Sequence, residues 1–189
     1  MTETDTNIPQ KSADAGRRRL LVGAGTAACI AGGVFSWWQG AAAVTDSSQT
    51  EPFPGFWDQK WDTPQGTVLR LQEFRGKPLL INFWATWCPP CIAELPLINE
   101  FYVKQKARGW QVIGLAVDRP AAVQGFLQKT PLNFPIALAG PTGGDIATKL
   151  GNPTGALPFS VALGSQGGIA QRKLGRLHPA DLDAWAQLK

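Results

Sequence analysis

The sequence predicts an α/β domain in which strands and helices alternate along the chain, preceded by an N-terminal signal or anchor helix. Continuous apolar segments such as Leu79–Trp84 are typical of buried strands, and segments with apolar residues at helical spacing separate them. The signal or anchor is predicted by residues 20–38, which carry no charge and directly follow three arginines, Arg17, Arg18 and Arg19.

The composition favours one ordinary domain with an appendage. The chain has 189 residues, of which 44% are hydrophobic and 17% charged, so a core can form without disulfide staples. The same values exclude collagen-like, coiled-coil and disordered classes. The net charge of +4 is partly due to the arginine cluster 17–19, and the rest of the chain mixes both signs. No nucleic-acid partner is therefore expected.

The three cysteines indicate redox chemistry. Cys88 and Cys91 form a C-x-x-C pair, while Cys29 lies in the N-terminal apolar segment. A structural zinc site needs four ligands, and His178 is the single histidine, so no metal site is predicted. A lone dithiol exchanges electrons through its own sulfurs, so no cofactor is expected.

Residues 1–43 are predicted to be a signal or a membrane anchor. The apolar segment has about the 20 residues that span a bilayer, and the basic cluster before it is expected to remain in the cytoplasm. The segment either stays as an anchor or is cleaved after the alanines at 41–43, which offer an A-x-A site. Residues 17–21, which read Arg-Arg-Arg-Leu-Leu, also resemble a twin-arginine export signal. Residues 44–52 are predicted to be a linker.

The folded domain is predicted to occupy residues 53–189. Residues 53–66 are expected to form the entry to the domain, with Trp57 and Trp61 packed at its edge. The first half is then expected to contain strand 67–71, buried strand 79–84, helix 90–108 ended by Gly109, buried strand 111–117 and helix 121–129.

The second half of the domain completes the pattern. We expect strand 134–138, helix 145–150 and a hairpin of strands 159–163 and 169–174. A last amphipathic helix should begin at His178 and Pro179, with His178 as its cap and the apolar residues Leu182, Trp185 and Leu188 facing inward. A βαβ unit followed by a ββα unit predicts an α/β sandwich.

The dithiol lies where a buried strand ends and a helix begins. Free amides at a helix N-terminus carry partial positive charge, so a sulfur held there ionises more readily. Cys88 is predicted to be the exposed nucleophile, and Cys91, three residues on, to lie deeper and resolve a mixed disulfide. Pro89 lacks an N–H that would otherwise stabilise the thiolate, so we expect a modest depression of the Cys88 pKa.

These residues carry a family resemblance. Residues 83–91 read Phe-Trp-Ala-Thr-Trp-Cys-Pro-Pro-Cys and are followed by Glu94 and Pro96, which resembles the thioredoxin superfamily and, within it, the exported TlpA/ResA-like branch. Residues 74–78 and 114–118 are also similar to that branch, so the resemblance extends from residue 53 to the C-terminus. It implies a thioredoxin-like three-layer sandwich with a central mixed β-sheet and a thiol-disulfide oxidoreductase activity.

The resemblance also implies a substrate-binding surface. Pro158 matches the family's cis-proline, which lies opposite the dithiol and contacts substrate, although a trans turn proline is the alternative. Leu157 before it, and Trp87 and Pro89 beside Cys88, complete the predicted surface. Because Phe159 follows where the branch often has threonine, the groove is expected to be more apolar than usual.

A third implication concerns the proton. Glu94 matches an acidic residue of the branch and is predicted to take the proton of Cys91 during catalysis, with an exposed helix face as the alternative. Cytoplasmic thioredoxins have a buried aspartate where this chain has Asn82. Because Asn82 cannot ionise, proton transfer is expected to depend on Glu94.

The resemblance predicts a protein-disulfide reductase on the periplasmic side of the bacterial inner membrane, anchored there or released after signal cleavage. Its substrates would be disulfides of exported proteins, of the cytochrome c biogenesis or copper-site maturation type, and an upstream membrane dithiol donor would recharge it. A disulfide-forming oxidase is the first alternative, because only the reduction potential separates the two. A Cu(I)-binding metallochaperone module is the second, disfavoured because Met1 is the single methionine.

Overall fold

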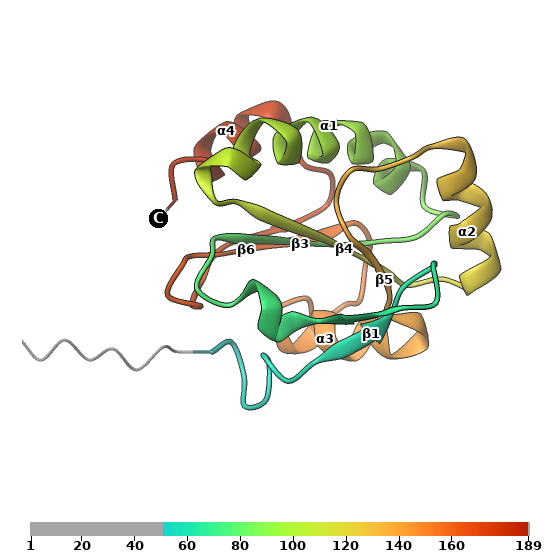
Figure 1. Ribbon diagram of the computed structural model, residues 1–189, viewed down its shortest axis with the longest axis horizontal. Coiled ribbons are helices and arrows are strands. Elements are labelled where there is room, and N and C mark those ends of the chain that lie inside the picture. Colours follow the sequence, from blue (N-terminus) through green and yellow to red (C-terminus); the bar gives the residue numbers. More distant parts are fainter. Residues whose placement is uncertain (1–50, 189) are drawn as a thin grey trace, which may run out of the picture. The chain divides into compact units, whose positions relative to one another are not determined.

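The computed structural model describes residues 51–188. A five-stranded mixed sheet, in the order β5-β4-β3-β6-β7, forms its centre, with helices on both faces (Figure 1). The strands of this sheet are β3 (Leu79–Trp84), β4 (Gln111–Ala116), β5 (Ile136–Leu138), β6 (Phe159–Leu163) and β7 (Ile169–Leu174). The three-layer α/β sandwich with a central mixed sheet is therefore confirmed.

Strand β3 is the centre of the sheet and is buried along its whole length. It pairs in parallel with β4 and antiparallel with β6, so each edge of its backbone is hydrogen-bonded to a neighbour. Both faces are covered as well, which explains why its sequence is nearly continuously apolar. The one exception is Asn82, which lies opposite Ser160 of β6 and Gly114 of β4.

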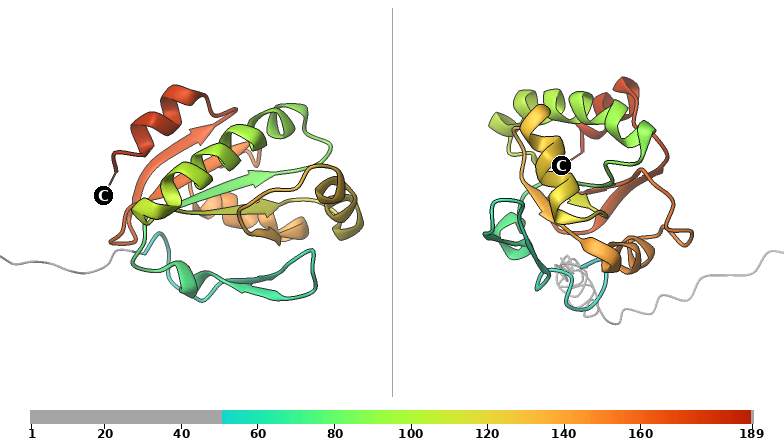
Figure 2. Two further views of the ribbon diagram at one scale, coloured as in Figure 1. Left: turned by 45° about the horizontal axis from the view of Figure 1, so that its top comes forward. Right: turned by 90° about the vertical axis from the view of Figure 1, so that its right-hand side faces the viewer.

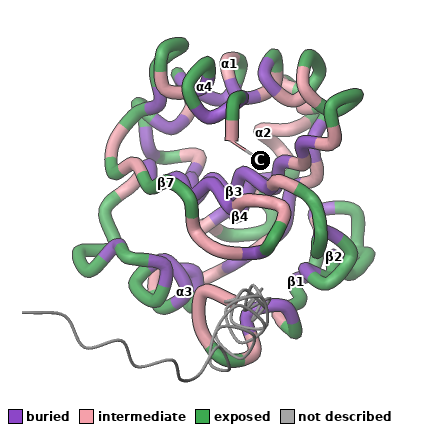
Figure 3. The backbone as a smooth tube through the Cα atoms, turned by 90° about the vertical axis from the view of Figure 1, so that its left-hand side faces the viewer, coloured by how far each residue is buried: buried purple, intermediate pink, exposed green. Residues whose placement is uncertain are grey.

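Helices cover one face of the sheet and a mixed layer covers the other (Figures 1 and 2). The first layer consists of α1 (Pro89–Gln105), α2 (Pro120–Lys129) and α4 (Pro179–Trp185). The second consists of α3 (Gly143–Lys149) with a small antiparallel sheet of β1 (Lys60–Asp62) and β2 (Val68–Arg70), followed by the short helix η1 (Leu71–Phe74). Two apolar clusters fill the spaces between the layers, and buried residues run through the sheet in Figure 3.

The predicted helices form with small shifts at their ends. Helix α1 starts at Pro89 and is followed by η2 (Lys106–Arg108), after which Gly109 adopts a φ of 95° and ends the helical segment as predicted. A further short helix, η3 (Gly140–Thr142), precedes α3. Helix α4 begins after His178, the predicted cap, and ends at Trp185, so Leu188 packs on the core from beyond the helix.

The entry to the domain differs from the prediction, because it contains strand β1. Only Trp61 of its three residues is buried, and so short an alternation gives no periodic signal. Strand β2 falls within the predicted segment but pairs with β1 rather than with the main sheet. Trp57 and Trp61 are buried in the core cluster next to α3, as expected of packing residues.

Several predictions concern residues outside the described part of the chain. The structure describes the chain from Glu51 onward. The predictions that lie outside it are those for the signal or anchor 1–43, including its arginines and Cys29, and for most of the linker 44–52. Within residues 51–188, no helix combines the length and the apolar character that a membrane span requires.

Gly114 leaves space for the Trp84 ring and offers a test of the packing. A Cβ at Gly114 would lie 2.6 Å from Ile136 Cδ1 and 3.1 Å from Trp84 Nε1, two buried side chains on neighbouring strands. We predict that Gly114→Ala lowers the free energy of unfolding by about 1–3 kcal/mol, measured by chemical denaturation.

Gly125→Ala is the matched control, because a Cβ at this position of α2 meets nothing within 4 Å. Alanine is the better helix former by about 1 kcal/mol, so this variant should be neutral or more stable than the parent. Equal losses from the two alanines would contradict the packing account.

Candidate redox site

Cys88 and Cys91 form a disulfide at the start of α1. Cys88 is the N-cap of the helix, and its Sγ accepts a hydrogen bond from the Cys91 N–H at 3.3 Å. Pro89 and Pro90 occupy the first helical positions, where a missing N–H leaves no helical hydrogen bond unmade. The sulfur thus lies at the positive end of the helix, as the sequence predicts.

The two sulfurs differ in access. Cys88 is 5% exposed and Cys91 is fully buried, so Cys88 is the less buried member of the pair. The prediction of an exposed Cys88 is therefore wrong for the disulfide form, in which Cys88 is buried because its sulfur is bonded to Cys91 in the core. Within residues 51–188, no group of three or more His, Cys, Asp or Glu side chains is arranged to hold a metal ion.

Glu94, one turn of α1 after Cys91, is fully buried rather than part of an exposed helix face. Its Oε1 accepts a hydrogen bond from Asn82 Nδ2 at 2.7 Å, and its Oε2 accepts one from the Leu177 N–H at 2.6 Å. Burial raises the pKa of Glu94 to about 7, although the two hydrogen bonds and the charge of Arg176 act in the opposite direction. The carboxyl group can therefore gain or lose a proton near neutral pH.

Three separate parts of the chain meet at Glu94. Asn82 comes from β3, and its Nδ2 also donates to Ser160 Oγ of β6 at 2.9 Å. Leu177 lies between β7 and α4, and next to it Arg176 donates to the Ala93 carbonyl at 3.2 Å. Sequence reasoning did not find Ser160, Arg176 or Leu177. Leu177 contributes only its backbone N–H, which no residue type signals.

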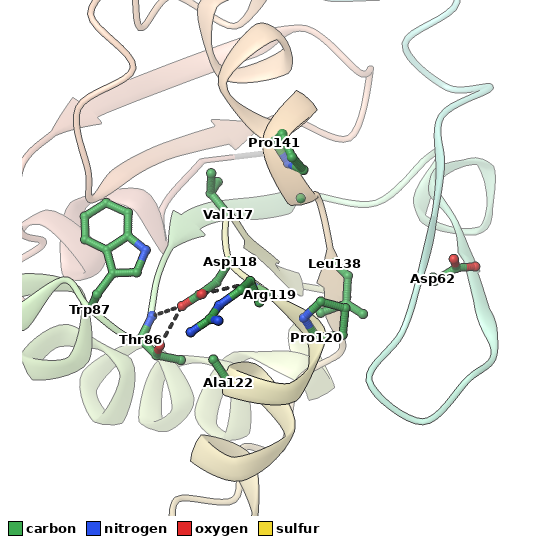
Figure 4. A pocket seen from close by; sticks show the side chains of 11 residues that line it. Asp62, Thr86, Trp87, Val117, Asp118, Arg119, Pro120, Ala122, Leu138 and Pro141 are labelled. Atoms are coloured by element: carbon green, nitrogen blue, oxygen red, sulfur yellow. Dashed lines mark hydrogen bonds between the residues drawn. The ribbon is translucent and has the colours of Figure 1, made fainter.

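The loop before Cys88 is attached to the end of β4 by Asp118. Asp118 Oδ2 accepts hydrogen bonds from the Thr86 N–H at 2.8 Å and the Thr86 hydroxyl at 2.5 Å, and Oδ1 accepts one from the Arg119 N–H at 2.7 Å (Figure 4). Partial burial alone would raise the pKa of Asp118. These bonds and the Arg119 charge outweigh it and hold the pKa below its usual range. The loop carries Trp87, whose side chain is 66% exposed.

An open hollow of about 660 Å³ lies beside Trp87. Figure 4 shows Trp87 on one side, with residues after β4 and β5 on the others. Its lining is mostly apolar and consists of Asp62, Thr86, Trp87, Val117, Asp118, Arg119, Pro120, Ala122, Leu138, Gly140 and Pro141.

The remaining residues of the predicted substrate surface are Pro89, between the two cysteines, and Leu157 and Pro158, directly before β6. Pro89 is exposed next to Cys88, while Leu157 is half-buried and Pro158 is buried. The Leu157–Pro158 peptide bond is cis, as the family resemblance implied. Phe159, the next residue, pairs with Phe83 near the C-terminal end of β3. Pro158 therefore lies at the same end of these strands as the segment that leads from β3 to Cys88.

A cysteine pair at the N-terminus of the helix after the central strand, with a cis-proline before the neighbouring strand, defines a thioredoxin-like thiol-disulfide oxidoreductase. The chain belongs to the Redoxin family, whose model matches residues 49–186.

Individual relatives agree with this assignment. A thiol-disulfide oxidoreductase, ResA, of Bacillus cereus is 32% identical over 126 residues, which cover 65% of this chain and 69% of the relative. A secreted thiol-disulfide isomerase of Corynebacterium glutamicum superposes with a TM-score of 0.62 at 25% identity, covering 68% of this chain and 81% of that one. A thiol:disulfide interchange protein of Chlorobium tepidum, 24% identical with a TM-score of 0.62, covers 68% and 90% and supports the fold.

The raised pKa of Glu94 predicts how stability changes with pH. In the unfolded chain the carboxyl group titrates near its ordinary value of 4.5, and in the folded chain near 7. Its contribution to stability is therefore complete below about pH 4.5, falls as the pH rises, and is lost above about pH 7. Relative to Glu94→Gln, the parent should lose about 3 kcal/mol across this range, measured by denaturation at each pH.

Glu100→Gln is the control, since it removes an exposed carboxylate of the same helix that pairs with Lys104. Its free energy of unfolding should follow that of the parent across the range. A difference between the parent and Glu94→Gln that does not change with pH would contradict the raised pKa.

Proposed function

We propose that the reduced form of this chain reduces disulfides of exported proteins, with Cys88 as the nucleophile and Cys91 as the resolving cysteine. The unequal burial of the two cysteines supports this assignment, because Cys88 is slightly exposed between the exposed Trp87 and Pro89, whereas Cys91 is fully buried. The Cys91 N–H directed at the Cys88 sulfur would also stabilise a thiolate there.

The reaction proceeds in two exchanges. The Cys88 thiolate attacks one sulfur of the substrate disulfide, forms a mixed disulfide and releases the other substrate sulfur as a thiolate. Cys91 then gives its thiol proton to the Glu94 carboxylate and attacks the Cys88 sulfur, which releases the second substrate thiolate. The substrate has gained two electrons, and the Cys88–Cys91 disulfide that remains is reduced by an upstream membrane dithiol donor in the reverse sequence.

Glu94 suits the role of proton acceptor for two reasons. It is fully buried one helical turn beyond Cys91, and its partner Leu177 belongs to the apolar cluster that also contains the dithiol, so water has little access. Its pKa of about 7 also lets the carboxylate accept a proton and later release it near neutral pH.

The substrate is proposed to lie across Trp87, Pro89, Leu157 and Pro158. Trp87 and Pro89 are exposed on either side of Cys88, and Leu157 presents an apolar side chain from the segment before β6. Such a surface favours a chain segment with apolar residues near its cysteine.

The domain 53–189 is proposed to act on the periplasmic side of the bacterial inner membrane, with linker 44–52 joining it to the signal or anchor 1–43. The uncharged segment after the arginines supports export. Family likeness supports apocytochrome c or copper-site thiols as substrates. Protease treatment of intact spheroplasts tests the location, because a cytoplasmic domain would be protected from digestion.

The reduction potential of the Cys88–Cys91 pair tests the direction of the reaction. We predict a value near that of thioredoxin, about −270 mV, when the full chain is equilibrated with thiol buffers. A value near −120 mV would favour the disulfide-forming oxidase instead. In the reductase case, Cys91→Ala should accumulate mixed disulfides with substrates, and the double variant Cys88→Ala/Cys91→Ala should capture none.

Loss of the proton acceptor should slow the second exchange. We predict that Glu94→Gln reduces a model peptide disulfide about 10²-fold more slowly than the parent at pH 8, because Cys91 then lacks a nearby base. Mixed disulfide should accumulate in rapid-quench samples. The control Glu100→Gln should retain the parental rate, and an unchanged rate in Glu94→Gln would remove Glu94 from the mechanism.

A further inference from the structure

A buried polar cluster lies behind the dithiol helix. Asn82 of β3, Glu94 of α1 and Ser160 of β6 are each fully buried, and the backbone N–H of Leu177 completes the cluster. Glu94 is the ionisable member. The other two side chains are neutral, and their partners are each other and the carboxylate.

The hydrogen bonds of this cluster leave one acceptor without a partner. The two hydrogens of Asn82 Nδ2 go to Glu94 Oε1 at 2.7 Å and to Ser160 Oγ at 2.9 Å. Asn82 Oδ1 is buried and has no partner. The two other such side-chain atoms within residues 51–188 are the indole nitrogens of Trp57 and Trp84, which are donors. An unpaired buried acceptor is costly, so its presence next to a titrating carboxyl group needs an explanation.

Protonation of Glu94 turns the carboxyl oxygen that faces Asn82 from a hydrogen-bond acceptor into a donor. The Leu177 N–H belongs to the backbone and always donates to Oε2, so the proton is expected on Oε1. There it would face Asn82 Nδ2, which also carries hydrogen. If the amide turns over, Oδ1 takes the place of Nδ2 and accepts from both Glu94 and Ser160, since a hydroxyl can donate as well as accept. One amide atom lacks a partner in either orientation, so the protonation state of Glu94 decides which orientation is favoured.

We propose that Asn82, supported by Ser160, is the positioning residue for Glu94 in both of its protonation states, donating to the carboxylate and, with its amide reversed, accepting from the acid. The inference rests on the proton-accepting role of Glu94 proposed above. An aspartate in place of Asn82 would put two acids side by side. A leucine there could form no hydrogen bond with either the carboxylate or the protonated form of Glu94.

The charged surroundings are consistent with this role. Arg176, on the connection between β7 and α4, is the positive group whose charge acts on Glu94, and it is held on the Ala93 carbonyl. From the sheet, β3 and β6 present the neutral Asn82 and Ser160. At the start of α1, the N-cap Cys88 and Cys91 form the disulfide that is reduced to two thiols.

The test uses three variants of the full chain and two measurements. The midpoint of Glu94 is followed by carbon NMR of its carboxyl group, and the pH–rate profile is measured with a small disulfide. Asn82→Leu should raise the midpoint by about one pH unit, because the bond to the charged form is the stronger one. The acid limb of the rate profile should move equally, with the full rate recovered at higher pH. The side-chain amide signals of Asn82 in the parent should titrate with the Glu94 midpoint.

Ser160→Ala and Ser160→Thr form the matched pair, which also covers the case in which Asn82→Leu does not fold. Ser160→Ala should shift the midpoint in the same direction by less, and Ser160→Thr, which keeps the hydroxyl, should restore it. An unmoved midpoint with a rate loss equal at every pH would overturn the proposal. A rate profile that does not change in Glu94→Gln would overturn the role of Glu94 instead, and the NMR midpoints would still decide the role of Asn82.

Discussion

Burial of the Glu94 carboxyl group between Asn82 and the Leu177 N–H is the interaction on which the arrangement around the dithiol depends. A carboxyl group placed in an apolar cluster must have partners, and these come from β3 and from the chain before α4. These two hydrogen bonds link α1 to the central strand and to the chain before α4, and apolar residues of both helices pack in one cluster on the sheet. The same burial raises the pKa of the group into the range where it can exchange protons.

The other side of the dithiol is held by a second carboxylate. Asp118 binds the loop before Cys88 through Thr86, with three donors on its two oxygens. Because its pKa is lowered while that of Glu94 is raised, the two acids behave differently near neutral pH. Asp118 remains ionised and holds the loop before Cys88, whereas Glu94 can gain or lose a proton. One carboxyl group therefore positions the loop, and the other is available for proton transfer.

The sequence predicted those helices and strands that are long enough to show a recognisable pattern of buried residues. The six residues of β3 and the apolar residues of α1 gave both elements and their order. Strand β1 was missed because three residues with one buried tryptophan resemble any turn. The pairing of β2 with β1, outside the main sheet, was equally invisible, since half-exposed strands of both sheets alternate alike.

The sequence by itself determined the chemistry of this protein: a dithiol three residues apart, a strand before it and a helix after it, which together favour an ionised sulfur. Those relations are local and follow from chain geometry. Only the tertiary structure decided which groups surround Glu94, because Ser160 and Leu177 lie 66 and 83 residues away along the chain and contribute a hydroxyl and a backbone amide. Burial and hydrogen bonding of that kind depend on long-range packing, which no short segment encodes.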